Sequence, residues 1–265
     1  MGITAKVLAD SINRKGHRIT TWELEYPRCI LAQLNTHRQG FARNTASNRA
    51  IPIEKNIELS SINMFVPTWT ENKSGMQGEF IKDESIKAQA NDIWNRVFKY
   101  NVKAMKELSK LGIHKQNANR LIEPFQYVKT VLTAGGEGLD NFYKLRIHQD
   151  AQAEIRDLAI AMKESQDNSE PVYLKSDEWH LPYITAEDRK ELTLEEQKRI
   201  SVSCCAQVSY RKLNTTKEKA LQIYDKLVQG DIIHGSAFEH VCRPEELFEW
   251  PKGCFKGWHQ FRHDI

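Results

Sequence analysis

The chain has 265 residues, of which 40% are hydrophobic and 28% are charged, a composition typical of a globular domain with a buried core. Its formal net charge of +3 argues against a general nucleic-acid binder and suits an anionic ligand held by a few arginines. No segment approaches the ~20 apolar residues of a membrane span, and the first residues lack an apolar signal core. We therefore expect a cytoplasmic protein with no membrane contact.

The cysteines are sparse and scattered. There are five of them, no CxxC pair occurs, and no spacing matches a zinc framework. We expect free thiols in a reducing compartment and no metal site.

The first 26 residues predict a helix and then a strand. Apolar residues recur at helical spacing from Ile3 to Ile12, and Gly16 follows as a stop. Residues 17–26 are rich in β-favouring residues and predict a strand.

A second helix and a long loop are expected next. Pro27 stands in the tolerated first turn of a helix predicted over 27–38. The polar stretch 39–82 predicts a long surface loop. An amphipathic pattern then predicts a helix over 84–111, with a lysine-rich face that we interpret as solvated.

The middle of the chain predicts a strand followed by helices. Residues 130–134 suit the end of a strand, and the glycine-rich residues 135–138 break it. The run 139–146 looks helical, and a further helix is expected after a cap at Asp150.

The last third predicts a connecting region over 166–193 and two helices near 194–210 and 216–229. Gly230 is expected to end the second of these helices.

The first motif begins with His37-Arg38 and continues eight residues later with Ser47-Asn48-Arg49. An arginine offers a rigid fork of donors to phosphate oxygens, and a nearby serine hydroxyl adds another donor. We therefore interpret Ser47 and Arg49 as candidates for binding a phosphate group.

The second motif lies between residues 139 and 155. It contains the segments Asn141-Phe142, Leu145-Arg146 and Ala151-Gln152-x-Glu154-Ile155. Arg146 is a candidate for contacting a ligand, and the alternative is a structural salt bridge to Glu154 or another acid.

The third motif is the segment 236–240, Ser-Ala-Phe-Glu-His, preceded by a helical stretch over 203–210. That stretch contains the adjacent Cys204 and Cys205. A cysteine nucleophile is one interpretation, but neighbouring cysteines in a helix are more often packing residues.

Together these motifs resemble the sequence blocks of flavin-dependent thymidylate synthases. In that family an Arg-His-Arg block is followed after seven residues by a serine, with an arginine two positions beyond. A block of the form Asn-Phe…Leu-Arg…His-Ala-Gln-x-Glu-Ile has the same spacing as the second motif. An Ala-Ala-Arg-Val-Ser-like helix leads to Pro-Phe-Glu-His, as in the third motif. The resemblance covers most of residues 20–165 and 200–242.

The order of the blocks differs from the family, in which the Glu-His segment precedes the His-Arg block. The whole chain, 1–265, is similar to one such domain that has been circularly permuted. Residues 17–165 match the family's C-terminal portion, 200–242 match its N-terminal portion, and 166–199 connect them. Because the termini of a domain often lie close together, the permutation implies adjacent chain ends.

The resemblance also implies roles for individual residues. His37 and Arg38 would contact the flavin or its pyrophosphate, Asn141 would orient the flavin, and His240 would lie over it.

The remaining matched residues would bind the substrate: Gln33, Ser47, Arg49, Arg146 and Gln152. Of these, Arg146 and Ser47 are the candidate catalytic residues. The arginine would favour negative charge on the uracil ring, so that C5 becomes nucleophilic without an enzyme thiol.

Several positions depart from the family pattern. Thr36 replaces the first arginine, and Thr45 replaces an acidic residue before the serine. Gly135 and Glu137 replace residues expected near the flavin, and Asp150 occupies a usual histidine position.

The resemblance implies FAD as cofactor, with NADPH, methylene-tetrahydrofolate and dUMP as reactants. It implies one-carbon transfer to C5 of the pyrimidine followed by reduction. It also implies a homotetramer with sites at subunit interfaces, and an α+β fold with a small antiparallel sheet surrounded by helices.

Three alternatives remain open from the sequence. In the first, the protein is an enzyme that acts on another pyrimidine such as dCMP, or that leaves a hydroxymethyl product. In the second, the chain is a non-catalytic flavin- or nucleotide-binding relative. The weakest alternative is a nucleic-acid binder that uses the lysine face of the helix at 84–111.

Overall fold

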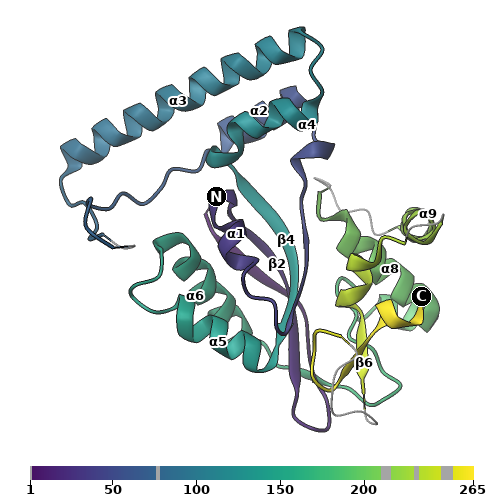
Figure 1. Ribbon diagram of the computed structural model, residues 1–265. Coiled ribbons are helices and arrows are strands. Elements are labelled where there is room, and N and C mark those ends of the chain that lie inside the picture. Colours follow the sequence, from purple (N-terminus) through teal and green to yellow (C-terminus); the bar gives the residue numbers. More distant parts are fainter. Residues whose placement is uncertain (1, 76–77, 210–215, 230–232, 246–252) are drawn as a thin grey trace.

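A five-stranded sheet with strand order β3-β4-β2-β1-β5 forms the centre of the fold (Figure 1). The computed structural model describes residues 2–75, 78–209, 216–229, 233–245 and 253–265. The strands of the sheet are β1 (Thr4–Ile12), β2 (Arg18–Pro27), β3 (Phe41–Thr45), β4 (Tyr127–Gly135) and β5 (Val172–Tyr173). A separate antiparallel pair joins β6 (Cys242–Pro244) to β7 (Trp258–Gln260).

The expected antiparallel sheet is a mixed sheet. The pairings β1–β2, β2–β4 and β3–β4 are antiparallel, but β5 lies parallel to β1, with Ser11 opposite Val172. The chain reaches this edge after crossing the face of the sheet as a helix, and such a crossover delivers a parallel strand. The α+β class is confirmed, and the purely antiparallel arrangement is wrong.

The helix predicted between Ile3 and Ile12 is strand β1. Ile3 and Val7 face one side of the sheet, whereas Leu8 packs on the other side. A bulge between Val7 and Ala9 interrupts the two-residue alternation. The bulge gives the apolar positions a spacing like that of a helix, and the long pairing with β2 makes the segment a strand.

Two layers of helices cover the sheet (Figure 1). The helices α5 (Gly136–Arg146) and α6 (Ala153–Asp167) cover one face, where Trp22 and Leu132 belong to the main core. The helix α8 (Leu194–Ala206) and the short helix at Gly235–His240 cover the other, against Val131. The alternation of β4 therefore supplies residues to both cores.

The predicted long helix is confirmed as α3 (Glu84–Lys110), and it lies beyond one end of the sheet (Figure 1). Its buried residues Phe98 and Met105 pack on a separate small core. The neighbouring helices are α2 (Ile53–Ile62) and α4 (Lys115–Ala118).

The loop expected over 39–82 contains β3 and α2. Phe41 and Ala42 are buried against the sheet, so this polar stretch still supplies an edge strand. The helix expected over 27–38 is shorter: a 3-10 turn at Arg28–Ile30 leads into α1 (Leu31–Leu34).

The expected cap at Asp150 is wrong, because α6 begins at Ala153 after Gln152. The connecting region holds β5 and the short α7 (Asp188–Glu191). The two predicted late helices are confirmed as α8 and α9 (Lys217–Val228). Gly230, and Tyr210 of the third motif, lie outside the described residues.

The two chain ends do not lie together. The amino-terminal end lies near α1, and the carboxyl-terminal end lies on the far side of the sheet near α8 (Figure 1). The expected adjacency of the termini is therefore wrong. No helix in the described part of the chain is long and apolar enough to cross a membrane.

Candidate functional site

His37 and Arg146 meet where α1 and α5 end. His37 follows α1 in a turn, in which its N–H donates to the Leu34 carbonyl at 3.2 Å. Arg146 is the last residue of α5, and its Nε donates to His37 Nε2 at 2.9 Å. Phe142, one turn earlier on α5, meets the imidazole edge-on with centroids 5.0 Å apart. These contacts fix the imidazole ring and the inner edge of the guanidinium.

The His37 imidazole is held in its neutral form. Burial lowers the pKa of His37 below its ordinary value, and the positive charges of Arg146 and Arg43 lower it further. Because Arg146 donates to Nε2, the ring proton of His37 lies on Nδ1. Within the described part of the chain, the terminal nitrogens of Arg146 donate no hydrogen bond, so they can bind a ligand.

A chain of hydrogen-bonded side chains joins α1 to the start of α6. Glu154 is 5% exposed, and its carboxylate accepts from the Thr68 N–H at 3.1 Å and from Gln152 Nε2 at 2.8 Å. Gln33 Nε2 in turn donates to Gln152 Oε1. Glu154 is thus occupied by these partners, and the alternative of a salt bridge to Arg146 is wrong.

One cavity of the described residues has a volume of about 1020 Å³. Four segments line it: the β1–β2 hairpin at 15–19, the loop 38–40, the β4–α5 turn at 135–140, and the loop 253–257 near the C-terminus. A second hollow of about 500 Å³ shares residues 38–39 and 137–138 with it. The second hollow is also lined by Thr36, His37 and Asn141.

Glycines allow two of these segments to touch. Gly40 has a φ of +70°, and a Cβ there would lie 2.5 Å from the Gly135 carbonyl oxygen. A Cβ at Gly138 would lie 1.9 Å from the Gln39 carbonyl oxygen. The start of α5 has no side-chain cap, so its first N–H groups are donors at the edge of the cavity.

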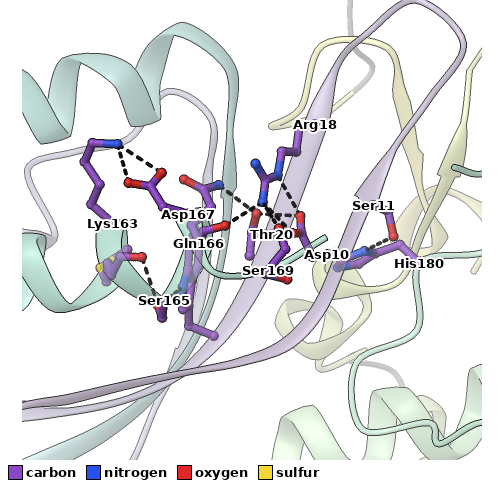
Figure 2. Close-up of polar contacts among 12 residues, drawn as sticks. Asp10, Ser11, Arg18, Thr20, Lys163, Ser165, Gln166, Asp167, Ser169 and His180 are labelled. Atoms are coloured by element: carbon purple, nitrogen blue, oxygen red, sulfur yellow. Dashed lines mark hydrogen bonds and ion pairs between the residues drawn. The ribbon is translucent and has the colours of Figure 1, made fainter. Parts of the chain in front are cut away.

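Among the cationic side chains of the cavity, Arg18 is bound within the chain. Its guanidinium donates to both oxygens of Asp10, at 2.9 and 2.6 Å, and to the carbonyls of Gln166 and Ser169 (Figure 2). Arg18 thereby anchors the β1–β2 hairpin to the end of α6.

The remaining charges of the cavity have both signs. The cationic residues are Lys15, Arg38 and Lys256, and the carboxylates are Glu137 and Asp140. Such a lining suits a ligand that carries anionic groups together with hydroxyl or amino donors.

Ser47 and Arg49 lie at the opposite end of β3 from Arg38. Ser47 precedes the 3-10 turn at Asn48–Ala50, and its hydroxyl accepts from the Arg49 N–H at 3.3 Å. The five residues of β3 separate the two ends by about 16 Å. The structure therefore does not bring this pair to the cavity within one chain.

His240 lies in the core on the sheet face opposite α5. It is fully buried, its Nδ1 is 2.8 Å from Thr133 Oγ1, and burial lowers the pKa of His240 to about 3. Thr133 bonds to Thr21, which bonds to His180 Nε2, and Ser11 bonds to the other ring nitrogen of His180 (Figure 2 shows this last contact). The structure does not bring His240 to the cavity.

Cys204 and Cys205 are buried inside α8. Burial raises the pKa of the Cys204 thiol to about 12 and that of Cys205 well above its ordinary value. The described residues contain no cluster of three or more potential metal ligands. These cysteines pack in the core and are not poised as nucleophiles.

Comparison with known proteins identifies the family. Residues 16–172, more than half of the chain, match the family model described as thymidylate synthase complementing protein. The chain belongs to this family.

Two relatives of the family are flavin-dependent thymidylate synthases. The protein from Pyrococcus abyssi is 32% identical over 95 residues, which cover 35% of this chain and 39% of the relative. The protein from Aquifex aeolicus is 29% identical over 147 residues, covering 54% of this chain and 44% of the relative. The chain thus spans less than half the length of each relative.

A solved structure shares the fold. It is a UMP/dUMP methylase, PolB, from Streptomyces cacaoi bound with 5-Br UMP. The TM-score is 0.51 at 17% identity, covering 63% of this chain and 89% of that chain.

The sequence interpretation missed the hairpin and C-terminal residues of the cavity. His17, Lys15 and Lys256 all line it. One signal was present: His17 stands just before the strand that leads to His37-Arg38, the place of the Glu-His segment in the family. Residues 135–138 also line the cavity. They were interpreted as a strand break, with Gly135 and Glu137 as departures from residues expected near the flavin.

Replacing Arg146 with glutamine is expected to raise the pKa of His37. The substitution removes a positive charge that lowers this pKa, while burial, the larger cause, remains. The pKa should therefore rise but stay below the ordinary value of about 6.5. NMR titration of the His37 ring measures it, with Lys144→Gln on the same helix as the control. An unchanged pKa in Arg146→Gln would show that the two side chains do not interact.

Proposed function

We propose that the chain is a flavin-dependent enzyme that transfers a one-carbon unit from methylene-tetrahydrofolate to C5 of dUMP, with reduction by NADPH. The observation that carries the proposal is the fixed Arg146–His37 pair beside a glycine-lined cavity with cationic walls. Family membership and the flavin-dependent relatives support the cofactor. The uracil nucleotides named for PolB support the substrate class.

The residues present fit FAD. A cavity of about 1020 Å³ has room for a dinucleotide, the cations suit a pyrophosphate, and the carboxylates can accept from ribose hydroxyls. Arg38 belongs to both hollows, and His37 and Asn141 line the smaller one. When bound, FAD would supply the redox chemistry and carry the one-carbon unit; these residues would bind and orient it.

Arg146 is proposed to act on the base. Its terminal N–H groups can donate to the carbonyl oxygens of a uracil ring, and they favour negative charge there. C5 then becomes nucleophilic without a covalent enzyme thiol. The buried, high-pKa thiols of Cys204 and Cys205 agree with such a mechanism.

Gln33 is proposed to select uracil over cytosine. The Glu154 carboxylate accepts hydrogen bonds but cannot donate, so the NH₂ of Gln152 must face it. The Gln152 oxygen then faces the NH₂ of Gln33. This leaves the Gln33 oxygen as an acceptor for the ligand, which matches the N3–H of uracil, whereas N3 of cytosine carries no hydrogen. The dCMP alternative is therefore disfavoured.

Ser47 and Arg49 are proposed to bind the nucleotide phosphate, with Ser47 also supporting catalysis. Their separation from Arg38 along β3 is consistent with sites shared between subunits of a homotetramer.

The proposal of one permuted domain rests on motif order alone, with 200–242 as the family's N-terminal portion. The proposed contact of His240 with flavin requires that the residues burying this histidine move apart.

Visible spectroscopy tests the proposal. The protein mixed with FAD is expected to show a bound-flavin spectrum, which dUMP perturbs and dCMP does not. Protein incubated with all reactants should then convert dUMP to dTMP. Flavin binding without turnover of any pyrimidine nucleotide would make the chain a non-catalytic relative. Absence of flavin binding under any condition would contradict the proposal.

Replacing Glu154 with glutamine is expected to reverse the amide chain. The new amide keeps an oxygen for Thr68 and turns its NH₂ toward Gln152, so that Gln33 presents its NH₂ to the ligand. The ratio of dUMP to dCMP affinity should fall roughly tenfold or more. Calorimetric titration of both nucleotides measures this ratio.

The matched control is Glu164→Gln, an exposed carboxylate on the same helix α6. It should leave the ratio unchanged. An equal ratio in Glu154→Gln and wild-type protein would show that Gln33 does not read the base.

A further inference from the structure

The loop 253–257 forms one wall of the cavity, although it lies beyond the residues that match the family model. Phe255 anchors the loop, because it is buried in one cluster with Ile19 and Ala42. The Asn13 side chain donates to the Gly257 carbonyl at 2.8 Å. The loop is therefore held on the β1–β2 hairpin, and the residues beside Phe255 are fixed in place.

Gly257 brings this loop into contact with His17. A Cβ at Gly257 would lie 2.2 Å from His17 Nδ1, so a larger residue would push the loop away. His17 Nδ1 is itself buried and makes no hydrogen bond. Burial and the charges of Lys256 and Lys15 lower the pKa of His17, which places both ammonium groups near the ring.

The cationic side chains on this wall suit a ligand that carries several negative charges. Lys256 makes no ion pair within the described ranges, and it is exposed to the cavity that Lys15 and Arg38 also line. Concentrating like charges is unfavourable unless an anion neutralises them. The carboxylates Glu137 and Asp140 in the same cavity can accept hydrogen bonds from the hydroxyl groups of a ribose.

We propose that Lys256, together with Lys15 and Arg38, binds a phosphate group of a nucleotide in this cavity. The inference rests on the proposed function for the identity of the nucleotide, either FAD or dUMP. It assigns the C-terminal loop, which the family model does not reach, a direct part in ligand binding.

The test compares Lys256→Gln, Lys256→Arg and wild-type protein in titrations with FAD, dUMP and inorganic pyrophosphate. Lys226→Gln on α9 is the matched control, because that exposed lysine does not line the cavity. Lys256→Gln should weaken binding of the phosphate ligand roughly tenfold or more, and Lys256→Arg should restore most of it. Lys226→Gln should match wild type, and the salt dependence should become shallower in Lys256→Gln alone. Circular dichroism confirms that each variant is folded.

The ligands separate the possible outcomes. Weakened binding of FAD assigns the phosphate to the cofactor, and weakened binding of dUMP assigns it to the substrate. If wild type binds pyrophosphate but neither FAD nor dUMP, and Lys256→Gln weakens that binding, the site is supported while the proposed function fails. If wild type and Lys256→Gln bind FAD and dUMP equally well, the inference is overturned and the proposed function stands. If wild type binds none of the three ligands, both are overturned.

Discussion

The close approach of the loop 38–40 to the β4–α5 turn is the constraint on which the site depends. Gly135 N–H donates to the Gly40 carbonyl at 3.1 Å, and neither Gly40 nor Gly138 has room for a Cβ. This contact places Arg38 over the start of α5, while the other end of α5 brings Arg146 to His37. The helix α5 thus links the cavity to Arg146, the arginine that we propose donates hydrogen bonds to the uracil ring.

The sequence predicted the elements whose signals are local. Strand β2 (Arg18–Pro27) and helix α3 (Glu84–Lys110) lie where alternation and helical period predicted a strand and a helix, because both signals act over short distances. The joint part of Arg146 and Gln152 in one site stays a proposal. The bulge in β1 defeated the same reasoning, since it gives a strand the apolar spacing of a helix.

Other parts of the site depend on contacts between distant residues, and the sequence did not reveal them. Lys256 lies more than two hundred positions from His17, and their proximity follows from the packing of Phe255 on the hairpin. His240 has the right neighbours in sequence, but the α8 layer buries it against Thr133. Whether a motif histidine faces a cavity or a core is decided by which layer covers it.

A crystal structure of the protein soaked with FAD tests the central claim most directly, because it locates the cofactor. We predict electron density for flavin in the cavity between Arg38, the residues 135–138 and the loop 253–257. Flavin bound elsewhere, for instance in a pocket opened around His240, would contradict the account.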